Sequence, residues 1–195
     1  MTSFSLSIDG VGVWSLRGGH RWSVGGPGSG ADLEFLAPLG KRAAEVTYED
    51  GRYRLRVGDG PEAGDRRAGD GPGGEVLRDG QSFSPGGGVE LRFRQPHPWS
   101  RAVTLVSVGP RPADGSDGLV LWSGPCVLGP QPDSHVVCRE WGEAVALFRW
   151  QDGPRWRRVD PLAATQEGNP GGVNRLTAGT LIETEAGRVL VGPAD

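Results

Sequence analysis

Short apolar runs alternate with polar residues along most of this chain. The runs 53–57 (YRLRV) and 89–93 (VELRF) place an apolar residue at every second position. A period of two indicates a β-strand with one buried and one solvated face, and no segment sustains the 3.6-residue period of a helix. The runs recur about every 8–12 residues, with Gly, Pro and Asp between them, which predicts an all-β sandwich fold.

One order of elements occurs twice along the sequence, at 23–51 and at 127–153. Each copy has a strand that ends in Gly, a short apolar strand, and a hairpin with an Asp-Gly turn, at 50–51 and 152–153. Asp-Gly suits a tight hairpin because glycine accepts positive φ. Anchoring the copies on these turns matches Val46 with Phe148 and Tyr48 with Trp150.

A repeat of about ninety residues is too long for a solenoid unit and predicts two tandem domains. The Pro-, Gly- and Asp-rich segment 108–118 has the composition of a linker. We therefore expect antiparallel β-sandwiches at residues 1–108 and 119–195, joined by a linker at 109–118. The irregular stretches 58–74 and 162–172 occupy matching places and are expected to be exposed loops.

Composition and charge narrow the classes of partner. The net charge of -3 disfavours nucleic acid, which binds proteins with a basic surplus. No apolar run approaches the roughly 20 residues of a membrane span, and the N-terminus lacks a signal-peptide pattern. We expect a cytoplasmic protein with no membrane association. Lys41 is the single lysine among 21 basic residues, a bacterial-like bias that a GC-rich genome also produces.

Cys126 and Cys138 are the two cysteines. A short loop between strands could bring them together in a disulfide, but a cytosolic protein favours two buried free thiols. Two cysteines without nearby histidine pairs make a poor zinc site, so we expect no metal and no other cofactor.

The repeated pattern resembles the forkhead-associated (FHA) domain, a β-sandwich that typically binds phosphothreonine peptides. The family pattern is an Ile-Gly-Arg strand end, an Ile-x-Leu strand, Ser-x-x-His, a hairpin, an Asn-Gly turn and a Leu-x-x-Gly-Asp segment. The first copy matches it at Val24-Gly25, 33–35 and 76–80, and the second at Leu128-Gly129, 136–138 and 176–179. The resemblance covers nearly the whole chain and implies two tandem FHA-like antiparallel β-sandwiches.

The phosphate-binding residues of the family are missing from both copies. The Arg, Ser and His positions hold Gly26, Gly40 and Ala43 in the first copy, and Pro130, Gly142 and Val145 in the second. Arg and Ser would supply charge-assisted and hydroxyl hydrogen bonds to phosphate. Their absence predicts that neither copy binds phosphothreonine in the conventional way.

A basic cluster leaves a second interpretation open. Lys41 and Arg42 lie where Ser-x-x-His belongs, and Arg66 and Arg67 lie in the long loop of the first copy. These residues either solvate the loops or form an atypical phosphopeptide site. The candidate ligand-loop residues are Gly26, Lys41, Arg42, Arg66, Arg67 and Pro130.

Enzymatic motifs are not recognisable. No G-x-S-x-G elbow occurs, the glycine-rich segment 25–32 lacks the Lys-Ser/Thr of a P-loop, and His20, His97 and His135 stand outside any motif. Seven tryptophans favour core packing but also allow a carbohydrate-binding surface.

We predict a non-catalytic adaptor or scaffold that binds a protein partner, with no catalytic, cofactor or metal residues. The FHA resemblance implies Ser/Thr-kinase signalling, with a kinase or its substrate as partner. The alternatives are a phosphopeptide reader with atypical basic loops and a carbohydrate-binding or hydrolytic β-sandwich.

Overall fold

The computed structural model describes residues 3–58, 74–159 and 172–193, and the regular structure in these ranges is all β-strand. The first ten strands are β1 (Ser3–Ile8), β2 (Gly12–Gly18), β3 (Arg21–Gly25), β4 (Leu33–Glu34), β5 (Ala44–Glu49), β6 (Arg52–Val57), β7 (Glu75–Val76), β8 (Ser82–Gly86), β9 (Val89–Arg94) and β10 (Ala102–Val108). The other eight are β11 (Gly118–Trp122), β12 (Cys126–Gly129), β13 (Val136–Val137), β14 (Ala144–Trp150), β15 (Gly153–Val159), β16 (Asn174–Arg175), β17 (Leu181–Thr184) and β18 (Gly187–Pro193). The predicted all-β, sandwich-like fold is confirmed.

Two five-stranded sheets repeat one strand order. The first small sheet is β4-β3-β5-β6-β7 and the second is β13-β12-β14-β15-β16. In each, the first pair of strands is parallel and the other pairs are antiparallel. The sequence repeat therefore corresponds to a repeated substructure.

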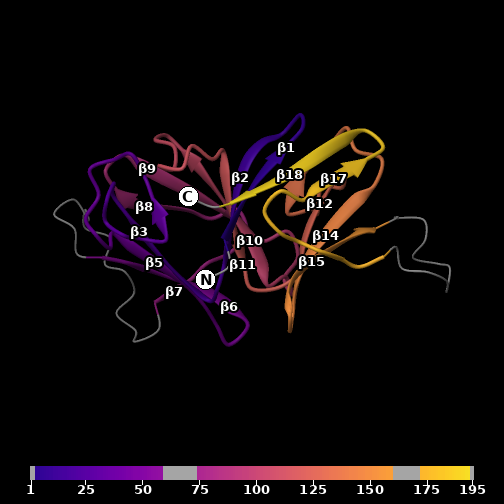
Figure 1. Cartoon of the computed structure of the whole chain (residues 1–195). Helices are drawn as coiled ribbons and strands as arrows, with labels where there is room; N and C mark the ends of the chain where they lie inside the picture. Colours follow the sequence, from indigo (N-terminus) through magenta and orange to yellow (C-terminus); the bar gives the residue numbers. More distant parts are fainter. Residues whose placement is uncertain (1–2, 59–73, 160–171, 194–195) are drawn as a thin grey trace.

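One eight-stranded sheet, β17-β18-β1-β2-β11-β10-β9-β8, serves both copies (Figure 1). Its two halves join where β2 pairs with β11 in parallel. The expectation of two separately closed sandwiches is wrong, because strands from both halves of the chain form this single sheet. The segment predicted as a linker, 109–118, instead connects β10 to its antiparallel neighbour β11.

Two hairpins of this sheet are exchanged between the copies. The hairpin β1–β2 leads along the chain into the first small sheet, but β1 pairs with β18, and Leu6 and Leu16 lie in the second core. The hairpin β10–β11 leads into the second small sheet, but β10 pairs with β9, and Leu105 lies in the first core. The division at residue 108 therefore does not coincide with the two cores.

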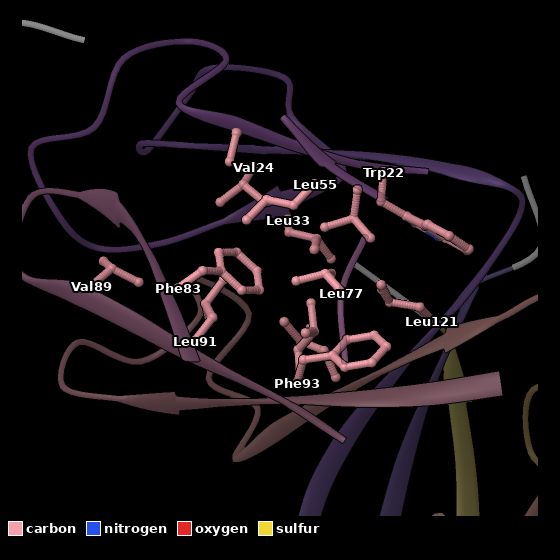
Figure 2. Packing of buried hydrophobic residues seen from close by; sticks show 14 of the residues in the cluster. Trp22, Val24, Leu33, Leu55, Leu77, Phe83, Val89, Leu91, Phe93 and Leu121 are labelled. Carbon is pink, nitrogen blue, oxygen red and sulfur yellow. The ribbon is translucent and has the colours of Figure 1, made fainter. Parts of the chain in front are cut away.

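The two cores lie on opposite faces of the shared sheet. Along β11, Leu119 and Leu121 belong to the first core, whereas Val120 and Trp122 belong to the second. A strand covered on both faces is apolar throughout, which explains the continuous run GLVLW. Figure 2 shows the first core, where Trp22 and Leu33 from the first small sheet face Phe93 from the large one.

The junction pairs residues 14–18 of β2 with their counterparts in the other copy. Trp14 lies beside Gly118, with the same sequence offset that separates Val24 from Leu128. A Cβ at Gly118 would lie 2.5 Å from the Trp14 ring. Glycine at this position therefore allows the indole to cover the backbone of the neighbouring strand.

The turn of the second small-sheet hairpin lies one residue earlier than the sequence match predicted. Asp50 and Gly51 form the first turn with φ of 52° and 76°. In the second hairpin Trp150 pairs with Gly153, so the turn is Gln151–Asp152 rather than Asp152-Gly153. Since a shift of one residue reverses the face of every side chain, the match of Val46 with Phe148 is wrong.

Cys126 and Cys138 are free and buried in the second core, which confirms the expectation of two thiols. Cys138 donates its backbone N–H to Gly129 O at 2.8 Å, as Phe35 does to Gly25 O at 3.0 Å. The cysteine thus occupies the place of a core phenylalanine in the first copy. Burial raises the pKa of both thiols, that of Cys138 to about 12.

Candidate functional site

The candidate ligand loops of the first copy are 26–32, between β3 and β4, and 35–43, between β4 and β5. Gly26 is buried and donates its N–H to Gly40 O at 3.3 Å. A Cβ at Gly26 would lie 2.6 Å from Leu39 O. This loop conformation therefore has no room for the arginine of the family pattern.

A carboxylate of the chain itself occupies the centre of loop 26–32. Glu34, on β4, accepts N–H bonds from Gly28 at 3.0 Å and Gly30 at 2.7 Å, and the Ser29 hydroxyl lies 3.3 Å away. The N–H groups of Gly28 and Gly30 hold the pKa of Glu34 below its ordinary value. The glycine-rich loop is thus an anion-binding loop whose anion is internal.

The glycine-rich segment 25–32 matched no P-loop, and the role of Glu34 was not predicted from the sequence. The available signal was a carboxylate a few residues after a run of glycines that can turn their N–H groups inward. Gly28 and Gly30 have φ of 68° and 71°, a region that favours glycine.

Next to this loop lies a hollow of about 520 Å³ between β4 and the segment 112–114. Its charged lining residues are Arg17, Asp32, Glu34 and Asp114. The Arg17 guanidinium is 2.8 Å from Asp114. Burial opposes ionisation of Asp114, but hydrogen bonds from Ser116, Ser15 and Arg17 together lower its pKa. A hollow with three carboxylates and one paired arginine is unsuited to a phosphate dianion.

The basic residues proposed for an atypical site lie partly within the described structure. Lys41 and Arg42 are exposed, and neither side chain makes a hydrogen bond or ion pair with another described residue. Arg66 and Arg67 lie outside the described residues. The structure therefore brings Lys41 and Arg42 next to the loop of Gly26 and leaves the four-residue cluster a prediction.

The corresponding loop positions of the second copy offer fewer hydrogen-bond donors to a ligand. Pro130 is half-buried and has no N–H, and Gly142 is exposed. Val145, at the histidine position of the family pattern, is fully buried in the second core. Gly129 also has no room for a side chain, since a Cβ there would lie 2.8 Å from that of Ala144.

His135 and Ser100 form a contact of the kind found in serine hydrolases, with Ser100 Oγ 2.6 Å from His135 Nε2. The other ring nitrogen, Nδ1, accepts the Val127 N–H at 3.0 Å and so carries no proton. The neutral ring therefore carries its proton on Nε2 and donates it to Ser100. Ser100 in turn donates to Ala102 O at 2.7 Å. A histidine that donates to the serine cannot act as its general base in this tautomer.

The first copy contains the counterpart of this histidine. Asp32 precedes β4 as His135 precedes β13, and it accepts the Ser23 N–H at 2.8 Å. Ser23 corresponds to Val127, so both side chains close the same turn onto the same backbone position. Burial, at 6% exposure, lowers the pKa of His135 to about 4. The shared bond identifies His135 as a structural residue.

The tryptophans are mainly core residues, as expected. Trp22, Trp122 and Trp141 are buried, while Trp99 is 84% and Trp150 63% exposed. The two exposed rings lie on different elements, in the loop between β9 and β10 and at the end of β14. The sequence could not separate these two from the other five.

Comparisons of the chain with protein-family models, curated proteins and solved structures found no match. No helix among the described residues is long and apolar enough to cross a membrane. No group of three or more potential metal ligands gathers within the described part of the chain.

Proposed function

We propose that this protein is a non-catalytic interaction module of FHA-like type that binds a protein partner without conventional phosphothreonine recognition. The FHA resemblance makes a Ser/Thr kinase or a kinase substrate the first candidate partner. The partner contacts sheet faces and edges rather than the ligand loops.

The observation that carries this proposal is the occupation of loop 26–32 by Glu34. The N–H groups that could cradle a phosphate already bind a carboxylate at 2.7–3.0 Å. A phosphate would have to displace Glu34 and would then meet Asp32 and Asp114 in the adjacent hollow. Nearby negative charges disfavour the binding of a further anion.

The absence of the family's phosphate-binding residues also weakens phosphothreonine binding. Each hydrogen bond to a charged group contributes roughly 1.5–3 kcal/mol. The absence of two or three of them weakens binding by several orders of magnitude, since about 1.4 kcal/mol is tenfold in Kd. Gly26 has no room for an arginine side chain, and Pro130, at the same position of the second copy, has no N–H to offer.

The hydrolytic alternative has less support. In the Ser100–His135 contact the histidine donates to the serine, which is opposite to the direction between a catalytic base and its nucleophile. In the first copy Asp32 makes the same backbone contact that His135 makes with the Val127 N–H. A carbohydrate-binding surface would need several exposed rings side by side, and the exposed Trp99 and Trp150 lie on different elements.

The test is a calorimetric titration of the full chain with a degenerate phosphothreonine peptide library and with its dephosphorylated form. We expect no binding of either at micromolar concentration. Micromolar binding that dephosphorylation abolishes would overturn the proposal. Its loss in Lys41→Ala/Arg42→Ala would then identify the atypical basic site.

A further inference from the structure

The outer face of the second small sheet combines an exposed tryptophan and a half-buried phenylalanine with arginines. Phe148 and Trp150 of β14 point away from the second core, and Arg155 and Arg157 of β15 are beside them. Arg175 of β16 pairs with Arg155 and extends the row. We call Phe148, Trp150, Arg155, Arg157 and Arg175 the Arg–aromatic face.

The first small sheet has glutamates on its outer face, which the second small sheet lacks. On its outer face, Glu45 of β5 is opposite Arg56 of β6, and Glu49 is opposite Arg52. Glu45 also forms an ion pair with Arg21 at 2.5 Å. In this sheet the chain's own glutamates lie opposite two of the arginines.

The hairpin turns define which residues correspond. Asp50–Gly51 and Gln151–Asp152 are the two turns, so Arg54 and Arg56 correspond to Arg155 and Arg157. On the neighbouring strand, Ala146, Phe148 and Trp150 replace Glu45, Thr47 and Glu49. The second sheet has thus kept two of the three outward arginines and carries apolar residues where the first sheet has its two glutamates.

The Arg–aromatic face is accessible and only partly neutralised. Trp150 is 63% exposed and packs edge-on against Phe148, with 6.1 Å between ring centroids. Asp152 forms an ion pair with Arg155 and lies 3.8 Å from Arg175. Arg157 is exposed and has no hydrogen bond or ion pair within the described residues.

We propose that the Arg–aromatic face is the docking surface for an acidic segment of a protein partner that also carries apolar side chains. The partner's carboxylates would contact Arg157, whose counterpart Arg56 is opposite Glu45, and the neighbouring Arg155 and Arg175. Its apolar side chains would cover Trp150 and Phe148, since exposed aromatic residues and arginine are the typical energetic anchors of interfaces. This inference rests on the proposed interaction function and names the partner's chemistry.

Fluorescence anisotropy with two labelled peptide pools tests the docking surface. Both pools are random sequences of about twelve residues, long enough to cross the sheet, built from Leu and Phe with either Asp and Glu or Lys and Arg. The full chain should bind the acidic pool and not the basic pool. The affinity should fall between about 50 mM and about 300 mM NaCl, because exposed ion pairs are screened.

Three variants locate the binding. Trp150→Ala and Arg157→Ala should each weaken binding by roughly tenfold. Trp150→Glu places on the second sheet the acid that Glu49 supplies on the first and should abolish binding. Arg56→Ala, the matched control on the first sheet, should leave the affinity unchanged.

Each contrary result has its own meaning. Failure of the acidic pool to bind, or an equal loss in Arg56→Ala and Arg157→Ala, would overturn the docking surface. Tighter binding of a thymidine oligonucleotide of about fifteen nucleotides would overturn it in favour of single-stranded nucleic acid. None of these results alters the phosphothreonine titration, so the interaction proposal fails or survives separately.

Discussion

The two small sheets have one strand order and two different surfaces. Their inward residues are equivalent in kind: Val46 and Leu147 are both fully buried. Their outward residues are not, since Glu45 and Glu49 of β5 give way to Ala146 and Trp150 of β14. A framework set by burial can thus persist while the solvent-facing positions become free to acquire a partner.

The ligand loops show the same contrast. In the first copy Asp32 closes the turn onto Ser23, and in the second His135 closes it onto Val127. Only the first copy places a carboxylate, Glu34, inside a glycine-rich loop. The turn geometry is kept with different side chains, and neither loop presents donors of the family type to a phosphate.

The largest expected effect concerns the shared sheet. Trp122→Ala should destabilise the protein by about 3–5 kcal/mol, because it removes a fully buried ring from the second core. Since β11 serves both cores, calorimetry should record a single unfolding transition in wild type and variant. Two transitions, with only one shifted by the substitution, would show that the copies fold independently.

Cys138, which takes the place of the core residue Phe35, should be protected from alkylation in the folded protein. With its pKa raised to about 12, the thiol should react with iodoacetamide at pH 8 roughly a thousandfold more slowly in the folded protein than in urea. The measurement is mass spectrometry of alkylated peptides over time. Equal rates in the two states would mean that the thiol is accessible, and a two-proton mass loss would mean a disulfide.

His135 gives the stability of the second copy a pH dependence. The folded-state pKa, about 4, is below the ordinary 6.5, so the unfolded chain takes up a proton first as pH falls. The stability is complete above pH 6.5 and declines toward pH 4, by about 2 kcal/mol at pH 5.

Urea unfolding at pH 7 and pH 5 checks this, with His135→Asn as the control. The wild type should lose more stability between the two pH values than the variant, which has no titrating ring at this position. An equal loss in both would assign the pH dependence to other groups.

The smallest effect is expected from transferring an acid of the first sheet to the second. Trp150→Glu changes a residue that is 63% exposed, so the free energy of unfolding should move by at most about 0.5 kcal/mol. Urea unfolding measures this change and shows whether the variant is folded for binding studies. A large loss would mean that Trp150 contributes to folding rather than to docking.

Local patterns in the sequence predicted much of the fold. The alternation in YRLRV and VELRF corresponds to β6 and β9, and Asp50-Gly51 forms the expected turn. The repeat was visible because Gly25 and Gly129 end equivalent strands. These features depend on neighbours along the chain, so periodicity and turn residues can reveal them.

The exchange of hairpins could not be predicted in this way. Nothing in the alternation of β1 distinguishes β18 from a strand of its own copy as a partner, since either pairing buries Leu6 and Ile8. The one-residue error in the second hairpin arose because Asp152-Gly153 has the composition of a turn, whereas Gly153 already opens β15.

The candidate site was predicted mainly by what it lacks. Gly26 and Pro130 were identified as missing donors, and the close contact of Gly26 with Leu39 O adds the steric reason. Glu34 escaped notice because a glutamate on a strand usually faces solvent. Only the loop conformation shows that it binds the N–H groups of Gly28 and Gly30.

The most direct test of the central claim follows the amide signals of Gly28 and Gly30 by NMR. If Glu34 occupies the loop, both signals should shift as pH falls and Glu34 is protonated, at a pH below the ordinary carboxyl value because the N–H bonds lower the pKa. They should lose this response in Glu34→Ala and should stay unchanged when a phosphothreonine peptide is added at neutral pH. Saturable shifts of both amides at micromolar phosphopeptide would contradict the account, because they would show that the loop receives a phosphate.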